Sequence, residues 1–375
     1  MEKSFRITAK QAYTLFMLAS LSPLVRLSSG LGARLGGRAG WVSVIISCAV
    51  FYGFIVLLSL YIKRSEQSTD LFSLYRSAFG KIPAGIAVLF YTVWVFWLAG
   101  FYLNAFSEKF TGWIMPGVPA GFFTITLLAL VFIILSGKFQ SFALLCDVFF
   151  YVVLLALAVI FALQLPQIRY ENLLPVTHYD AAGIIAGVLP TLGIFAYITP
   201  LLFLGGEIKS DFRLFRKHGL YSALTLLAAG LVIFVTTAGV FGKDLTGEMA
   251  QPFLMSVKTV GAGGALERLE SIFLLLWVVT DLAIIVMLMH ILLKLVNLLT
   301  GGNSAENTAP GGSPLLKSPL LLGVYVLSLF MERGIDEMLG LKVNLVMGFA
   351  VPTAAVIIYG IKTSFSKALS KPDNP

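Results

Sequence analysis

Ten apolar runs divide the chain, and each is about as long as a helix that crosses a bilayer. Spanning about 30 Å of hydrocarbon takes roughly 20 helical residues. The runs cover residues 8–36, 41–62, 84–107, 118–136, 142–164, 181–206, 219–241, 270–299, 315–331 and 344–363. The pattern predicts an all-α integral membrane protein with about ten transmembrane helices.

Composition agrees with this prediction and adds an orientation. Hydrophobic residues make up 58% of the 375 residues and charged residues only 12%, whereas soluble domains carry about 25% charged residues. The net charge of +8 is explained by the excess of Lys and Arg on the cytoplasmic side of membrane proteins, so no nucleic-acid partner is expected. With the N-terminus inside, cytoplasmic basic residues outnumber the others by about two to one, which predicts that both termini are cytoplasmic.

The chain is predicted to form a single transmembrane domain over residues 1–375, with no soluble domain inserted. Residues 301–314, GGNSAENTAPGGSP, are expected to be a flexible cytoplasmic loop. The motifs typical of serine hydrolases, phosphate loops and zinc proteases are absent, and the histidines and the two cysteines are scattered. We therefore expect neither an enzyme nor a cofactor or metal site.

Two of the predicted helices contain residues that interrupt helical structure. Residues 20–32 read SLSPLVRLSSGLG, and residues 187–193 read GVLPTLG. Proline removes a backbone donor and glycine weakens a helix. Irregular backbone at membrane depth persists where it is buried or lines a cavity, although single kinks are also ordinary in transmembrane helices.

The two interruptions lie five helices apart, in spans one and six. This spacing predicts a five-plus-five inverted repeat, with halves at about 8–164 and 181–363, helices one and six discontinuous, and a substrate held at the breaks. Exposed amino ends of half-helices would bind a carboxylate, and exposed carbonyl ends a cation or an ammonium group.

Charged and aromatic side chains extend this candidate site. Arg26 and Asp281 are the charges placed deepest in the hydrocarbon. They either pair with each other or let the guanidinium replace a coupling cation; alternatively, Arg26 reaches the outer interface and Asp281 bonds a neighbouring hydroxyl. A sodium ion could instead be held by Thr280, Asp281 and carbonyls of helix one.

Aromatic side chains on helix three share one helical face, which serves either as a wall of the ligand pocket or as packing. The candidate ligand-binding residues of all these elements are Ser22, Pro23, Arg26, Ser29, Gly30, Trp94, Trp97, Phe101, Pro190, Thr191, Gly193, Thr280 and Asp281.

Several stretches, taken in order, resemble the spore germination permeases, the B subunits of endospore nutrient-germinant receptors, and are most similar to the clostridial type. They are Ile7-Thr8-Ala9-Lys10-Gln11, Leu21-Ser22-Pro23-Leu24-Val25-Arg26-Leu27, Gly37-Arg38-Ala39-Gly40-Trp41, Glu171-Asn172-Leu173-Leu174-Pro175-Val176, Gly205-Gly206-Glu207 and Leu266-Glu267-Arg268-Leu269-Glu270-Ser271-Ile272-Phe273 with Trp277. The likeness runs from helix one to helix eight, whereas the last two helices match only in hydrophobicity.

The resemblance implies a leucine-transporter-like fold of the amino acid–polyamine–organocation superfamily. It also implies an amino acid or similar germinant as ligand, A and C receptor subunits as partners, and a place in the inner spore membrane. Glu207, Glu267, Arg268 and Glu270 would then have structural or gating roles. The alternative functions are an amino acid transporter coupled to H⁺ or Na⁺, and a purely structural membrane scaffold.

Overall fold

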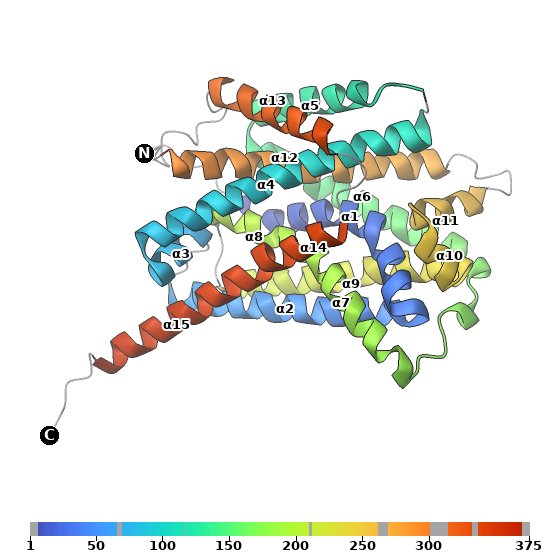
Figure 1. Cartoon of the computed structure of the whole chain (residues 1–375), viewed down its shortest axis with the longest axis horizontal. Helices are drawn as coiled ribbons and strands as arrows, with labels where there is room; N and C mark the ends of the chain where they lie inside the picture. The colour runs from blue at the N-terminus through green and yellow to red at the C-terminus, as the bar shows by residue number, and fades with distance from the viewer. Residues whose placement is uncertain are drawn as a thin grey trace.

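The computed structural model describes residues 7–65, 70–115, 117–209, 212–261, 269–300, 314–331 and 337–369. These residues form a bundle of helices (Figure 1). The long helices are α1 (Ala9–Gly36), α2 (Gly40–Arg64), α4 (Lys81–Lys109), α5 (Ala120–Ser136), α6 (Phe139–Gln164), α7 (Ala181–Ile194), α9 (Phe212–Phe241), α12 (Leu269–Leu299), α13 (Pro314–Phe330) and α15 (Val351–Leu369). Shorter helices are α3 (Leu71–Phe79), α8 (Ile198–Leu201), α10 (Lys243–Glu248), α11 (Pro252–Gly261) and α14 (Glu337–Leu345).

Each of the predicted apolar runs is helical, which confirms the all-α membrane class. Seven helical segments of the described chain are long and apolar enough to cross a membrane, and the first of them, Ala9–Arg64, contains both α1 and α2. Two shorter apolar helices cover Ala120–Ser136 and Lys317–Phe330. The predicted loop at 301–314 lies outside the described residues except for Pro314, which begins α13.

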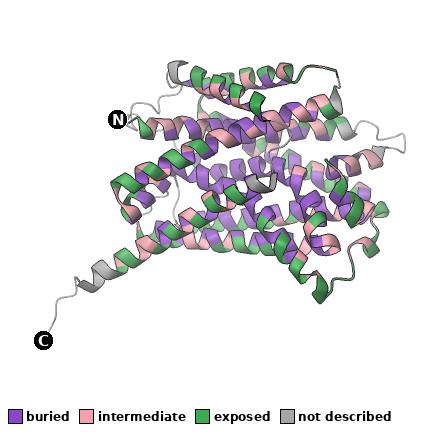
Figure 2. Cartoon of the chain, in the orientation of Figure 1, coloured by how far each residue is buried: buried purple, intermediate pink, exposed green. Residues whose placement is uncertain are grey.

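Helix α1 lies in the centre of the bundle and is buried along almost its whole length. It contacts α2, α6, α7, α9 and α12, and the buried residues gather around it, whereas α5 and α13 at one margin are largely exposed (Figure 2). Many exposed side chains are large and apolar. An outward-facing apolar surface around a buried core is what a bundle immersed in lipid requires.

The predicted interruption of span one is wrong. Helix α1 continues through Pro23 to Gly36, because packing on all sides overrides the low helix propensity of its Pro, Ser and Gly residues. The chain then turns at Gly37, whose φ of +58° favours glycine. Helix α2 begins at Gly40, where an added Cβ would lie 2.4 Å from the Gly32 carbonyl oxygen, so glycine is what lets α1 and α2 approach.

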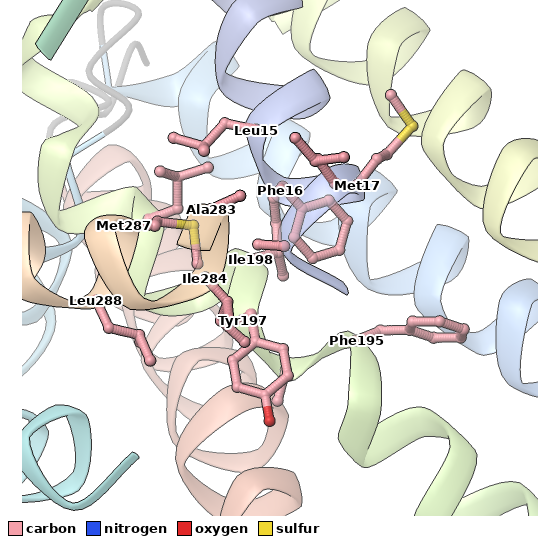
Figure 3. Packing of buried hydrophobic residues seen from close by; sticks show 14 of the residues in the cluster. Leu15, Phe16, Met17, Phe195, Tyr197, Ile198, Ala283, Ile284, Met287 and Leu288 are labelled. Atoms are coloured by element: carbon pink, nitrogen blue, oxygen red, sulfur yellow. The ribbon is translucent and has the colours of Figure 1, made fainter. Parts of the chain in front are cut away.

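The predicted interruption of span six is confirmed, although it begins after Pro190 rather than at it. Helix α7 ends at Ile194 and is followed by a 3-10 turn η6 (Phe195–Tyr197), the single turn α8 and a second 3-10 segment η7 (Leu202–Glu207). Side chains of η6 and α8 meet α1 and α12 in the core (Figure 3).

A second irregular span exists, but it is the tenth rather than the first. Between α14 and α15 the chain forms a π-helix, η8 (Val346–Ala350). Another π-helical segment, η2 (Phe110–Ile114), directly follows α4. Short strands β1 (Ile7–Thr8) and β2 (Ile208–Lys209) pair in parallel and join the start of α1 to the end of span six.

Candidate functional site

Asn344 of α14 is the centre of a buried hydrogen-bond network at the break in span six. Its Oδ1 accepts a bond from Trp94 Nε1 of α4 at 3.0 Å. Its Nδ2 donates to the Gly193 carbonyl at 3.4 Å and to the Tyr197 hydroxyl at 3.2 Å. The Tyr197 hydroxyl also bonds the Tyr102 hydroxyl of α4. One amide thus ties the last turn of α7 and the following 3-10 turn to two neighbouring helices.

The irregular parts of spans six and ten lie against each other. Thr199 of α8 donates to the Gly348 carbonyl of η8 at 2.5 Å, and Tyr91 of α4 donates to the Met347 carbonyl at 2.5 Å. A Cβ added at Gly348 would lie 2.4 Å from the Ala196 Cβ, so the two backbones are nearly in contact. Carbonyl groups that a π-helix leaves without a helical donor are therefore bonded by side chains of adjacent helices.

A second buried cluster joins α1, α4 and α12. Ser22 donates to Asp281 Oδ1, and Lys109 pairs with Asp281 Oδ2. The three residues are 3%, 5% and 4% exposed in the order Ser22, Asp281, Lys109. The Lys109 ammonium also lies 4.0 Å from the centre of the Trp277 ring. Charges buried this deeply in a membrane protein are rare and normally paired, as these are.

Among the described residues, the cation that pairs with Asp281 is Lys109 rather than Arg26, whereas the alternative that Asp281 bonds a neighbouring hydroxyl agrees with the bond from Ser22. The Arg26 guanidinium instead lies 4.8 Å from the centre of the Phe101 ring. Trp97 stacks on Phe101 with ring centroids 5.5 Å apart. The aromatic face predicted on helix three therefore meets α1 at Arg26.

The other predicted site residues bond within their own helices or are simply buried. The Thr280 hydroxyl donates to the Trp277 carbonyl at 2.7 Å, and that of Thr191 donates to the Gly187 carbonyl at 2.9 Å. The remaining ones, Pro23, Ser29, Gly30 and Pro190, are buried in α1 and α7.

Glu207 ends span six and is bound by α12. Lys294 Nζ donates to Glu207 Oε1 at 2.6 Å, and His290 Nε2 lies 4.0 Å from Oε2.

Asp70, the N-cap of α3, accepts a bond from the Ser73 amide at 3.1 Å. Burial has the largest effect on the pKa of Asp70 and raises it above its usual value. The hydrogen bond from Ser73 and the nearby Lys294 charge lower the pKa, and the Glu207 charge raises it, each by less than burial does. Glu267 and Arg268 lie outside the described residues, as does the side chain of Glu270.

Sequence reasoning missed Lys109 and Asn344. Lys109 is the last residue of α4, where a lysine is ordinarily solvated and counts toward the charge bias. Its offset of seven from Tyr102 places both on one helical face, which was the available signal. The predicted charge bias places Lys109 on the outer side and Lys317 on the cytoplasmic side, and both side chains are buried. Without these two residues the predicted bias stays near two to one. Asn344 gave no signal beyond being a polar residue in an apolar run.

Over the part of the chain that the structure describes, no group of three or more His, Cys, Asp or Glu side chains is arranged to hold a metal ion. The polar groups of both clusters are instead amides, hydroxyls, aromatic N–H groups and a single ion pair. Such groups suit the binding of a small polar molecule and the holding of helices in a defined arrangement.

A family of proteins described as spore germination proteins matches residues 6–305 of the chain. The match ends just after α12, which is also where the resemblance in local motifs ends. No curated protein matches.

Proposed function

The chain belongs to the spore germination protein family, and we propose that it is the membrane subunit of a germinant receptor. It binds a small nutrient, an amino acid in the first place, inside the helix bundle, and partner subunits respond to occupancy. The family is one of membrane permeases and receptors rather than enzymes. A bundle built from apolar helices without an inserted domain leaves the membrane interior as the place where binding occurs.

The observation that carries this proposal is the Asn344 network at the break in span six. Buried polar groups are costly in lipid and mark functional sites in membrane proteins. Here the Gly193 carbonyl and the Tyr197 hydroxyl share one donor, the Asn344 amide. A ligand with its own donors and acceptors can exchange with these bonds and so change how span six is held.

The contacts between helices support a five-plus-five repeat. In such a repeat, each span corresponds to the span five places along the chain. The contact between α1 and α9 then corresponds to the contact between α7 and α2, and the contact between α1 and α6 to that between α7 and α14. In the same way, the contact between α5 and α12 corresponds to that between α13 and α4, and the contact between α2 and α15 to that between α9 and α6. Both members of each pair are present, as a bundle of two similarly folded halves requires.

The side chains around the break fit an amino acid. The Arg26 guanidinium lies beside Phe101, on which Trp97 stacks, and so offers a positive charge next to an aromatic surface. This combination suits a carboxylate attached to an apolar side chain. The hydroxyls of Tyr102 and Tyr197, which bond each other, can accept from an ammonium group. These contacts support an amino acid over an ion or a large hydrophobic ligand.

The irregular segments also provide a means of signalling. Spans six and ten meet through η6, α8 and η8, where the helix type changes between 3-10, α and π within a few residues. Occupancy of the adjacent site would shift this junction between two arrangements. Helix α15 leaves the junction and extends out of the bundle (Figure 1). We infer that A and C subunits detect this shift in the inner spore membrane, with both chain termini on the cytoplasmic side.

Equilibrium binding of labelled amino acids to the purified protein tests the proposed site. A Cβ at Gly193 would lie 2.9 Å from the Leu341 carbonyl oxygen, so Gly193→Leu forces α7 and α14 apart. Gly53→Leu is the matched control, because an added Cβ there meets nothing within 4 Å and the residue is exposed. Saturable binding that Gly193→Leu abolishes and Gly53→Leu retains is expected. Equal amino acid binding by both variants would show that the binding site does not lie at the break in span six.

A further inference from the structure

Asp281 has a complete set of partners in the core of the bundle. One carboxylate oxygen accepts from the Ser22 hydroxyl of α1 and the other pairs with the Lys109 ammonium of α4. The Lys109 ammonium faces the rings of Trp277 and Phe106, at 4.0 and 5.9 Å from their centres. The cluster is therefore an ammonium ion enclosed by one carboxylate and two aromatic surfaces, with almost no exposure to solvent.

The charge balance of this cluster is already closed. Asp281 supplies one negative charge and Lys109 one positive charge at contact distance. A metal cation placed between α1 and α12 would add a second positive charge to a single carboxylate in a region of low dielectric constant, where repulsion is strong.

The backbone of α1 also offers few oxygen atoms for a metal ion. Hard cations such as Na⁺ need several oxygen ligands. The Thr280 hydroxyl donates its hydrogen to the Trp277 carbonyl of its own helix and keeps its lone pairs. Because α1 stays helical past Ser22, its carbonyls there bond within the helix, except that of Ala19, whose partner four residues on, Pro23, has no N–H. The charge balance, more than the number of oxygen atoms, therefore argues against a sodium ion at this place.

We propose that Lys109 is a tethered cation that permanently occupies the cation position between α1 and α12, so that nutrient binding needs no sodium ion. This inference rests on the proposed function, because it states that the proposed nutrient site needs no sodium ion. Lys109 acts as a positioning residue: it neutralises Asp281 and fixes α1 to α12 and α4. Lys109 is the last residue of α4, directly before the π-helix η2.

Thermal unfolding of the full-length protein in detergent, without nutrient, tests the proposal. The midpoint is measured at equal ionic strength in choline chloride, sodium chloride and methylammonium chloride for the natural sequence, Lys109→Ala and Lys317→Ala. Lys317 is the matched control, because it is also 4% exposed, but its Nζ donates to the Leu135 carbonyl at 2.7 Å rather than to a carboxylate. Labelled amino acid binding is then compared in sodium and choline chloride.

The natural protein should unfold at the same temperature in all three salts and bind its amino acid equally with and without sodium. Lys109→Ala should unfold at a lower temperature in choline chloride, and sodium or methylammonium should restore part of the loss, because a small cation can then reach Asp281. Lys317→Ala should be destabilised without any such restoration. Where Lys109→Ala does not fold, Lys109→Gln replaces it.

Two results would overturn the proposal. One is a natural protein that sodium stabilises relative to choline. The other is a Lys109 variant whose unfolding is as insensitive to small cations as that of Lys317→Ala. Because unfolding is measured without nutrient, a failure to bind any amino acid would count against the proposed function, whereas the unfolding data would still decide whether Lys109 fills the cation position.

Discussion

Replacing Asn344 by alanine should cost more stability than replacing a half-buried asparagine of the same bundle. Asn344 is 3% exposed and makes three hydrogen bonds, to Trp94, Gly193 and Tyr197. Interhelical hydrogen bonds in membrane proteins contribute about 0.6 kcal/mol each, so the three together account for about 2 kcal/mol. The Trp94 indole N–H is left buried without its acceptor, which adds about 1–3 kcal/mol. The expected loss for Asn344→Ala is therefore about 3–5 kcal/mol.

Two further variants separate the parts of this estimate. Trp94→Phe removes the donor together with its need for an acceptor, so it should cost less than Asn344→Ala. Asn104→Ala removes the single bond that Asn104 Nδ2 donates to the Met331 carbonyl at 2.8 Å, and should cost about 0.6 kcal/mol. Unfolding in detergent with a chemical denaturant gives the three free energies. A loss for Asn344→Ala no larger than that for Asn104→Ala would refute the central role of this amide.

Two other substitutions, Gly40→Ala and Asp70→Asn, test the packing of α1 against α2 and the charge next to α3. Gly40→Ala should lower the free energy of unfolding by about 1–3 kcal/mol, because its Cβ would lie 2.4 Å from the Gly32 carbonyl oxygen. Gly53→Ala, where nothing lies within 4 Å, should be neutral or stabilising, and equal effects of the two changes would contradict the close approach of α1 and α2. Burial raises the pKa of Asp70 above 3.8, so the folded state holds this proton more tightly than the unfolded state and stability falls as pH rises above about 3.8. Asp70→Asn keeps a capping side chain and should lack this decrease when unfolding is followed as a function of pH, whereas identical profiles would show that Asp70 does not contribute.

The boundaries of the helices were largely predictable, because length and apolar content decide which segments enter a bilayer. The continuity of α1 was not, since it depends on neighbours. Pro23 and the Ser and Gly residues after it predict an interruption from local propensity, but α1 is enclosed by other helices and stays regular. The irregular backbone of η8 was not predicted either, because its carbonyls bond side chains of distant helices, as that of Met347 does with Tyr91, and sequence patterns do not encode such contacts.

Only part of the candidate site could be predicted from the sequence. Gly193 and Asp281 were found because breaks and deep charges are visible in one dimension. The partner of Asp281 was not, since Lys109 lies at the end of its helix and the contact between α4 and α12 that brings the two together is tertiary. Asn344 lies beyond residue 305, where the family likeness ends, so nothing in the motifs singled it out.

The central claim is that span six holds a nutrient for sensing rather than for transport. It is tested most directly by measuring binding and time-dependent uptake of labelled amino acids together, in proteoliposomes with and without H⁺ and Na⁺ gradients. The natural protein, Gly193→Leu and Gly53→Leu are compared. Saturable binding without accumulation, lost in Gly193→Leu and kept in Gly53→Leu, is the predicted result. Gradient-driven accumulation by the natural protein would contradict the account and make the chain an amino acid transporter.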